Sequence, residues 1–203
     1  MELYNRGYMY DTALSYYIAP TGEEVEAYFA EHESDYAASG ITRSSGKLVD
    51  IRHILLIPQV PEDGTETVTV APDGTVTCSE ELWDACLTSA QTLVEDYEKA
   101  LKKDSMRGNN KSTDDAIFAD FANKNSADTG SALNGGLYQK LRKGQLTPVL
   151  DAWCFDDARR SGDVDILRSD LGYHVIFFKG STDIWYDAAR KDLTAALGGE
   201  KIA

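Results

Sequence analysis

One short stretch, residues 49–57, constrains the fold of this chain more than any other part of it. It reads Val-Asp-Ile-Arg-His-Ile-Leu-Leu-Ile and stops at Pro58. Its branched and leucine side chains, uninterrupted by glycine, predict a buried β-strand. His53 stands in the middle, and a buried imidazole needs partners for both ring nitrogens. From this stretch alone, a core histidine satisfied by its neighbours is the simpler interpretation and a functional histidine is the alternative.

Length and charge limit the classes of protein to consider. The 203 residues can form one domain, or one domain with a small additional lobe. With 20 Lys and Arg against 34 Asp and Glu, the net charge of −14 argues against nucleic-acid binding, because such a surface repels phosphates. No apolar run is long enough to span a membrane. The first residues lack a signal-peptide pattern, so we expect either a cytosolic protein or a chain trimmed of its leader.

The first 46 residues predict a helical arm. Residues 8–18 are apolar and aromatic and are expected to be helical up to Pro20. Thr21 is expected to cap a second helix whose apolar stripe includes Phe29. His32 is expected on the exposed face of that helix.

The segment after the histidine strand predicts a β-hairpin followed by helices. Residues 66–70 and 75–78 alternate in polarity on either side of the turn signal Ala-Pro-Asp-Gly. Ser79 then caps a long amphipathic helix over about 80–103, and Thr113 caps a shorter one. Cys78 and Cys86 are close enough in sequence to pair, whereas Cys154 is expected to be a buried thiol.

The second half of the chain predicts a small-residue loop, a helix, two strands and a last helix. The loop covers residues 126–138, and its adjacent Gly135 and Gly136 suggest positive φ or close approach of the backbone. A helix is expected over 149–155, strands over 164–168 and 173–178, and an amphipathic helix over 183–197. His174 lies within the second strand, as His53 lies within the first.

Taken in order, these motifs resemble one family. A His-Ile-Leu strand, a long helix, Ser-x-Asp-x-x-Ser-Ala-x-x-Gly-Gly-Leu, a Gly-Gln-Leu helix entry and a Gly-Tyr-His-Val-Ile strand follow one another. The pattern resembles the parvulin-type (PpiC, rotamase) peptidyl-prolyl cis-trans isomerases over roughly residues 49–179, apart from the hairpin. The resemblance implies an α+β fold: a parvulin-like four-stranded antiparallel sheet wrapped by helices, with flanking N- and C-terminal helices and a β-hairpin insertion. The expected domains are 1–46 (helical arm), 47–180 (isomerase domain, with the insertion at about 59–79) and 181–203 (a helix packing with the arm).

The resemblance also implies a site. His53 and His174 match the paired central histidines of the family, and Asp128 matches a position that holds aspartate or cysteine. These three are the expected catalytic residues, with the histidines chiefly structural and Asp128 chiefly catalytic. The expected substrate-binding residues are Leu55, Leu137, Leu146, Leu150 and Phe155. Leu150 departs from the family because phenylalanine usually stands there in the proline pocket, so the resemblance implies that Leu150→Phe raises turnover or leaves it unchanged.

The implied function is rotation of Xaa-Pro bonds without a covalent intermediate or a cofactor, in proline-containing polypeptide clients. Residues 58–64 contain no Lys or Arg where the phosphate-reading members carry a basic cluster, so selectivity for phosphorylated substrates is not expected. The flanking helices resemble those of secreted or lipid-anchored bacterial foldases, which implies an extracytoplasmic location, with the cytoplasm as the alternative.

Two other interpretations remain open at this stage. The chain is alternatively a catalytically weak parvulin-fold chaperone or protein-binding module, because Leu150 removes an aromatic wall. His53, His174 and Asp128 are also a conceivable two-histidine, one-carboxylate metal set. The apolar strands and the lack of ligand spacing within one helix make the metal site the weakest of the three interpretations.

Overall fold

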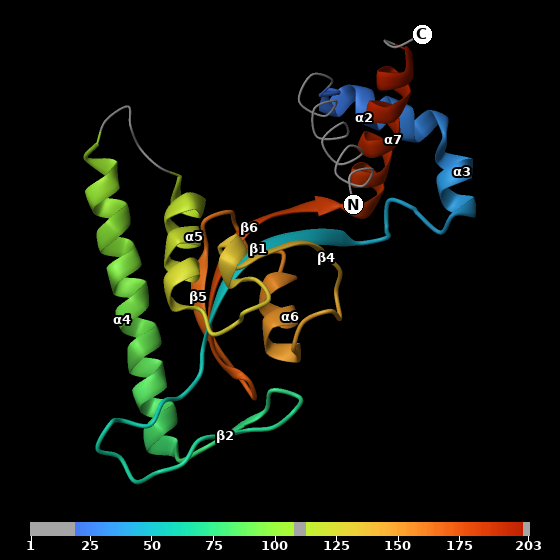
Figure 1. Cartoon of the computed structure of the whole chain (residues 1–203). Helices are drawn as coiled ribbons and strands as arrows, with labels where there is room; N and C mark the ends of the chain where they lie inside the picture. The colour runs from blue at the N-terminus through green and yellow to red at the C-terminus, as the bar shows by residue number, and fades with distance from the viewer. Residues whose placement is uncertain (1–18, 108–112, 201–203) are drawn as a thin grey trace, which may run out of the picture. The chain divides into compact units, whose positions relative to one another are not determined.

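A computed structural model of the chain describes residues 19–107 and 113–200 (Figure 1). The helix expected over residues 8–18 lies outside the described residues. The chain divides into two compact units: Leu48–Ser181 forms one, and residues 1–47 with 182–203 form the other. No helix in the described part is long and apolar enough to cross a membrane.

A four-stranded antiparallel sheet is the centre of the unit Leu48–Ser181. Its strand order is β4-β1-β6-β5, so the two strands that carry histidines are neighbours. The strands are β1 (Lys47–Leu56), β4 (Leu137–Leu141), β5 (Val164–Ser169) and β6 (Gly172–Asp183). The mixed α+β fold that the sequence predicts is confirmed.

Both faces of β6 are covered, which explains its continuous apolar sequence. Because successive side chains of a strand point to opposite faces, Tyr173, Val175 and Phe177 lie on one face and the side chains of residues 174, 176 and 178 on the other. The first face packs on helices α4 (Glu80–Ser105) and α5 (Asp114–Asn125). The second packs on helix α6 (Pro148–Cys154), and Figure 1 shows α6 on the opposite side of the sheet from α4.

The helices begin where the sequence predicts. The hydroxyl of Ser79 accepts from the Leu82 amide at the start of α4, and that of Thr113 accepts from the Ala116 amide at the start of α5. In α6, Pro148 occupies the first turn, where the missing N–H costs nothing. The small-residue loop between α5 and β4 contains a short 3₁₀ helix, η2 (Ala132–Asn134).

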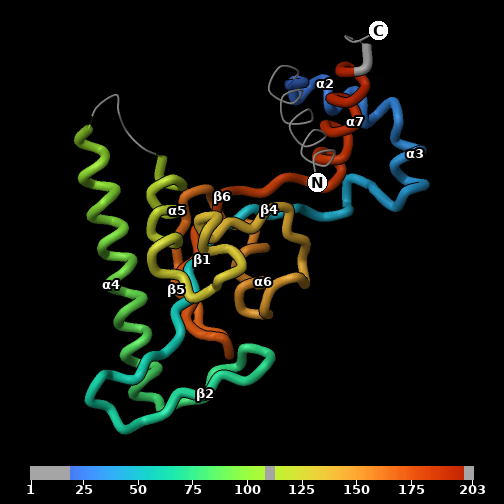
Figure 2. Tube along the Cα trace, viewed as in Figure 1, coloured from blue at the N-terminus to red at the C-terminus, as the bar shows by residue number. Residues whose placement is uncertain are grey.

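The hairpin insertion is present but much shorter in hydrogen-bonded length than expected. Its strands are β2 (Thr69–Val70) and β3 (Val76–Thr77), paired antiparallel as a separate two-stranded sheet. A two-stranded ribbon without a third strand has little to stabilise it, which accounts for the short pairing. In Figure 2 the hairpin passes beside the turn between β5 and β6, where the Val76 amide donates to the Asp170 carbonyl at 2.7 Å.

The second unit is helical in its described part. It contains α2 (Gly22–Glu31), α3 (Glu33–Ala38) and α7 (Ile184–Glu200), with α2 packed on α7. Its core is aromatic and aliphatic: Val25, Phe29, Tyr36, Trp185, Ala189 and Leu193. The Arg43 guanidinium lies 4.5 Å from the centre of the Trp185 ring and pairs with Glu26, and so covers one side of this core.

Three expectations about individual residues can be compared with the structure. His32 is half-buried at the end of α2 instead of exposed on its face, because it stacks on Tyr28 and its Nδ1 lies 2.9 Å from the Tyr28 carbonyl. Cys78 and Cys86 are both free thiols, so the suggested pairing is absent. Cys154 is a fully buried thiol, as expected.

Candidate active site

A pocket of about 210 Å³ opens on the α6 side of the sheet, within the unit Leu48–Ser181. Its walls come from β1, β4, β6, the β5–β6 turn and the entry to α6. Four of the lining side chains are aliphatic, three carry rings, and Gln145 and Thr147 are polar. The full lining is Ile51, His53, Tyr138, Gln145, Leu146, Thr147, Leu150, Leu171 and His174. A small pocket of this composition suits an apolar ring with one polar bond beside it.

The two central histidines meet across neighbouring strands. His53 and His174 are buried, with 8% and 3% of their surface exposed. Their Nδ1 atoms are 3.4 Å apart and their rings lie nearly parallel, at 16°. The expected pairing of the two imidazoles is therefore present in the structure, and one Nδ1 must donate to the other.

The network continues past His174 into the β5–β6 turn. The Nε2 atom of His174 lies 2.7 Å from Oγ of Ser169, and that same oxygen accepts from the Leu171 amide at 3.1 Å. Leu171 lines the pocket, so Ser169 links the outer end of the histidine pair, at His174, to this part of the pocket wall.

At the other end, Asp128 collects hydrogen bonds from three side chains. Its Oδ2 lies 2.9 Å from Nε2 of His53 and accepts from the Tyr138 hydroxyl at 3.0 Å. The Ser131 hydroxyl donates to the same oxygen. The Gly130 amide donates to Oδ1 at 3.1 Å. The carboxylate is thus held by four donors and acts as the fixed end of the network.

These partners assign the tautomers of both rings. Because the ionised carboxylate of Asp128 only accepts, His53 carries its proton on Nε2 and leaves Nδ1 as an acceptor. His174 must then donate from Nδ1 and accept at Nε2 from the Ser169 hydroxyl. Every ring nitrogen is satisfied while both histidines are neutral.

The pKa values agree with this assignment. Burial lowers the pKa of His53, and the bond to Asp128 opposes this only in part. Burial, and next the neighbouring His53, lower the pKa of His174 to about 4. Burial alone would raise the pKa of Asp128, but the hydrogen bonds from Ser131, His53 and Tyr138 outweigh it and bring the pKa to about 2. The site at neutral pH therefore holds two neutral imidazoles and one carboxylate.

A glycine allows the loop that carries Asp128 to approach β1. Gly136 has φ of 68°, and a Cβ on it would lie 2.1 Å from the His53 carbonyl. In this position its own carbonyl accepts from the His53 amide at 2.9 Å. Arg52 donates to the carbonyls of Asn134 and Gly135 and also pairs with Asp115, which fastens the same loop to α5. The positive φ suggested for the glycine pair is confirmed.

Not all of the residues expected to bind substrate line the pocket. Leu146 and Leu150 do, whereas the lining does not include Leu55, Leu137 and Phe155. Phe155 packs behind the pocket in the cluster around Leu150, and Leu55 approaches Gly172. The sequence analysis did not identify Ile51, Tyr138, Gln145, Thr147 and Leu171 as lining residues. The apolar alternation of β1 could have indicated Ile51, which is two residues before His53.

The three candidate metal ligands do not converge on a common point. His53 directs one nitrogen at Asp128 and the other at His174, so its ring has no lone pair left for a metal. No group of three metal-type side chains is found among residues 19–107 and 113–200.

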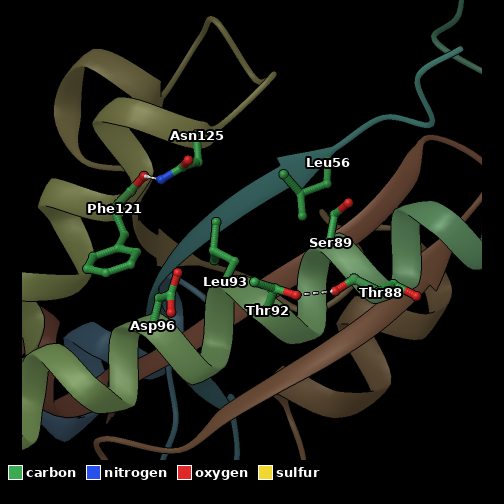
Figure 3. A pocket seen from close by; sticks show the side chains of 8 residues that line it. All are labelled: Leu56, Thr88, Ser89, Thr92, Leu93, Asp96, Phe121 and Asn125. Carbon is green, nitrogen blue, oxygen red and sulfur yellow. Dashed lines mark hydrogen bonds between the residues drawn. The ribbon is translucent and has the colours of Figure 1, made fainter. Parts of the chain in front are cut away.

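A second pocket lies on the other side of the sheet, between α4 and α5 (Figure 3). Its polar side chains are already engaged: Thr88 and Thr92 donate to main-chain carbonyls one turn back, and Asp96 pairs with Lys99. Asn125 likewise donates to the Phe121 carbonyl. Lacking a titratable cluster, this hollow is a weaker candidate than the histidine pocket.

The histidine pocket defines a class of site without an activated nucleophile. Its carboxylate is fully bonded, its imidazoles are neutral and engaged, and its walls are apolar. Residues 83–181 match the model of the PPIC-type PPIASE domain. This stretch, just under half of the chain, is similar to the parvulin-type peptidyl-prolyl isomerase domain.

Curated relatives are foldases and chaperones. Foldase protein PrsA 2 of Listeria monocytogenes is 28% identical over 184 residues, covering 86% of this chain and 59% of the relative. Chaperone SurA of Chromohalobacter salexigens is 37% identical over 92 residues, covering 42% of this chain and 20% of the relative. The chain thus spans less than two thirds of the length of either relative. The crystal structure of PrsA from Bacillus subtilis aligns with a TM-score of 0.41 and 21% identity, over 97% of this chain and 66% of that chain.

Proposed function

We propose that this protein is a peptidyl-prolyl cis-trans isomerase that assists protein folding and has no requirement for a phosphorylated substrate. The observation that carries the proposal is the neutral His53–His174 pair beneath an apolar pocket, with Asp128 bonded at its end. The matching domain family and the foldase names of the relatives support it.

The chemistry required is rotation about one bond. An Xaa-Pro amide crosses a barrier of roughly 18–20 kcal/mol, and the planar forms are more dipolar than the twisted one. A dry, apolar pocket that holds the proline ring disfavours the planar amide more than the twisted one, which lowers the barrier without a covalent step. The histidines and Asp128 keep the floor of the pocket rigid and electrically fixed while the peptide turns.

The catalytic assignment of His53, Asp128 and His174 is part of the proposal, as is substrate binding by Leu146 and Leu150. We further propose that residues 1–46 and 181–203 bind client polypeptides. We also propose an extracytoplasmic location, which the similarity to PrsA foldases and to SurA supports, and unfolded, proline-containing polypeptides as the clients.

The test is the turnover of a panel of Xaa-Pro tetrapeptides. NMR exchange spectroscopy measures the cis-trans exchange rate directly, so no coupled protease is needed. We expect cis-trans exchange to accelerate in proportion to the protein concentration. The same peptides without protein give the uncatalysed rate. No acceleration on any peptide by the unaltered protein would refute the isomerase proposal.

A second function, holding unfolded chains without turnover, is favoured by one observation. Leu150 is 3% exposed within a packed cluster, so the pocket lacks an aromatic wall at that position. Suppression of client aggregation by a variant without isomerase activity would establish this function separately.

A further inference from the structure

One aromatic ring in the pocket belongs to a residue with no assigned role, Tyr138 on β4. Like Leu146, it is partly buried and packs against the apolar cluster that contains Leu150. All three residues line the same pocket. Its ring meets that of His53 nearly edge to face, with centroids 5.1 Å apart at 65°. Its hydroxyl donates to Asp128 Oδ2 at 3.0 Å, so the ring is fixed at both ends.

The other rings that line the pocket are the two imidazoles, and both are held within the hydrogen-bond network. At position 150 the chain has an aliphatic side chain, and that side chain is already buried among its neighbours. Tyr138 is therefore the one carbocyclic ring among the described residues that line the pocket. Since its hydroxyl is bonded to Asp128, the part of Tyr138 left for a ligand is the ring itself.

We propose that Tyr138 is a substrate-binding residue that supplies the aromatic wall against the proline ring, in place of the wall that Leu150 lacks. This inference rests on the proposed isomerase function and identifies what selects proline within that site. An aromatic face gains from contact with the ring's C–H groups beyond the burial of apolar area alone. Asp128 then acts in part as a positioning residue for Tyr138, because the hydrogen bond fixes the orientation of the phenol.

A double-mutant cycle between positions 138 and 150 tests the proposal. The variants are Tyr138→Leu, Leu150→Phe and the double variant, with affinity for an Ala-Pro tetrapeptide measured by NMR titration and KM and kcat by exchange spectroscopy. We expect Tyr138→Leu to weaken binding roughly two- to tenfold. Adding Leu150→Phe to Tyr138→Leu should restore most of that loss, whereas Leu150→Phe alone should give a smaller gain, because the pocket already holds one aromatic ring.

Two further variants separate the ring from other effects. Tyr138→Phe keeps the ring and removes the bond to Asp128, so it should retain more affinity than Tyr138→Leu. Phe121→Leu removes an aromatic ring from α5, on the other face of the sheet from the histidine pocket, and should leave peptide affinity unchanged. Equal losses in Tyr138→Phe and Tyr138→Leu would overturn the proposal, because the hydroxyl would then be the important group.

The unaltered protein provides a measurement that does not depend on any variant folding. Nuclear Overhauser contacts between the proline ring protons of the bound peptide and the Tyr138 ring are expected. Their absence, wild-type affinity in Tyr138→Leu, or no rescue by Leu150→Phe would each overturn the inference while isomerase activity stands. A parent protein that neither binds nor turns over any Xaa-Pro peptide would overturn the proposed function and this inference together.

Discussion

The Nδ1 atoms of His53 and His174 face each other at 3.4 Å, and this pair has room for only one proton between its rings. From the Ser169 hydroxyl through both imidazoles to Asp128, all donors point the same way along the chain of hydrogen bonds. Protonating His53 would bring two N–H groups together in a buried place, and protonating His174 would place an N–H group where the Ser169 hydroxyl now donates. The pair is therefore stable as two neutral rings, and acid should disrupt it.

The first prediction is a loss of stability below neutral pH. The pKa of His174 is about 4 in the folded protein, below its ordinary value of 6.5, and that of His53 is lowered as well. Between these values the unfolded chain binds protons that the folded chain does not, so the free energy of unfolding falls as pH drops from about 6.5 to about 4. His174 alone accounts for up to roughly 3 kcal/mol. Urea unfolding at several pH values checks it, and His174→Asn should flatten the curve.

A second prediction concerns Asp128. The sequence analysis expects Asp128 to be chiefly catalytic, which by itself implies that Asp128→Ala lowers kcat/KM with little effect on stability. In the structure, however, four donors hold the carboxylate. We therefore expect Asp128→Ala to destabilise the protein by about 2 kcal/mol as well. Asp128→Asn keeps the shape and can still accept at one oxygen, so it should fold better while losing about tenfold in kcat/KM.

The matched comparison for Asp128 is Ser131→Ala, which removes one donor to the carboxylate and leaves the carboxylate itself. Thermal unfolding and kcat/KM are measured for all three variants. Full activity in Asp128→Asn would show that the charge of Asp128 has no part in turnover. Since the folded pKa of Asp128 lies near 2, its contribution to stability should be present above about pH 4 and disappear toward pH 2.

The sequence predicted the histidine pair because its two strands have unmistakable apolar patterns. Antiparallel neighbours bring the middle residues of such strands together, so His53 and His174 could be paired before any coordinates. Asp128 was implied only by the resemblance to the parvulin family, through the motif Ser-x-Asp-x-x-Ser. What the sequence could not provide was the role of the hydroxyls around them. Ser131 belongs to that motif but nothing in the motif pairs it with Asp128, and Ser169 is indistinguishable by pattern from the other serines.

Strand β4 shows why the pocket wall was only partly predicted. Successive side chains of a strand face opposite ways, so choosing Leu137 instead of Tyr138 moves the assignment to the other face. In the structure Tyr138 pairs with Ile51, which lines the pocket, and Leu137 pairs with Arg52. The register between β1 and β4 also shifts between Val49 and Ile51, and Lys140 has a φ of 54°. Irregularities of this kind leave no periodic signal.

The third prediction concerns the hairpin, which the sequence analysis identifies as an insertion into the family pattern. None of its residues is among those that line the pocket, but a Cβ on Gly74 would lie 3.0 Å from Leu171 Cδ2. Leu171 is a pocket wall, so the hairpin supports that wall from outside. We therefore expect replacement of residues 62–78 by a Gly/Ser loop to raise KM about fivefold, a loss of ~1 kcal/mol, with kcat less affected.

A pair of point variants isolates that contact. Gly74→Ala and Gly162→Ala both place a side chain at φ near 90°, but only the first meets another residue within 4 Å. Similar losses of stability are expected from the backbone strain, about 1 kcal/mol each. A rise in KM is expected for Gly74→Ala alone. Equal KM values for the two variants, or an unchanged KM after the loop replacement, would show that the hairpin has no part in substrate binding.

The fourth prediction is that phosphorylation of the residue before proline slows turnover. Among the described residues, no Lys or Arg lines the pocket, and the carboxylate of Asp128 stays ionised beside it. With a net charge of −14 as well, the protein should repel a dianionic phosphate. Turnover of Ser-Pro and phospho-Ser-Pro peptides is compared at low and high salt, and the difference should shrink at high salt. Faster turnover of the phosphorylated peptide would contradict this expectation.

The last prediction concerns Thr147, which precedes α6 and lines the pocket. Its hydroxyl is buried and has no hydrogen-bond partner among the described residues, and it does not cap the helix that it begins. A buried hydroxyl without a partner costs about 1–3 kcal/mol, so a bound peptide carbonyl is the acceptor that we expect it to meet. Thr147→Val should therefore stabilise the free protein by about 1 kcal/mol and raise KM several-fold, while Thr147→Ser keeps KM near that of the parent. Unfolding free energies and KM are measured on the three proteins together. A valine variant that is more stable and binds peptide as well as the parent would mean that this hydroxyl has no part in substrate binding.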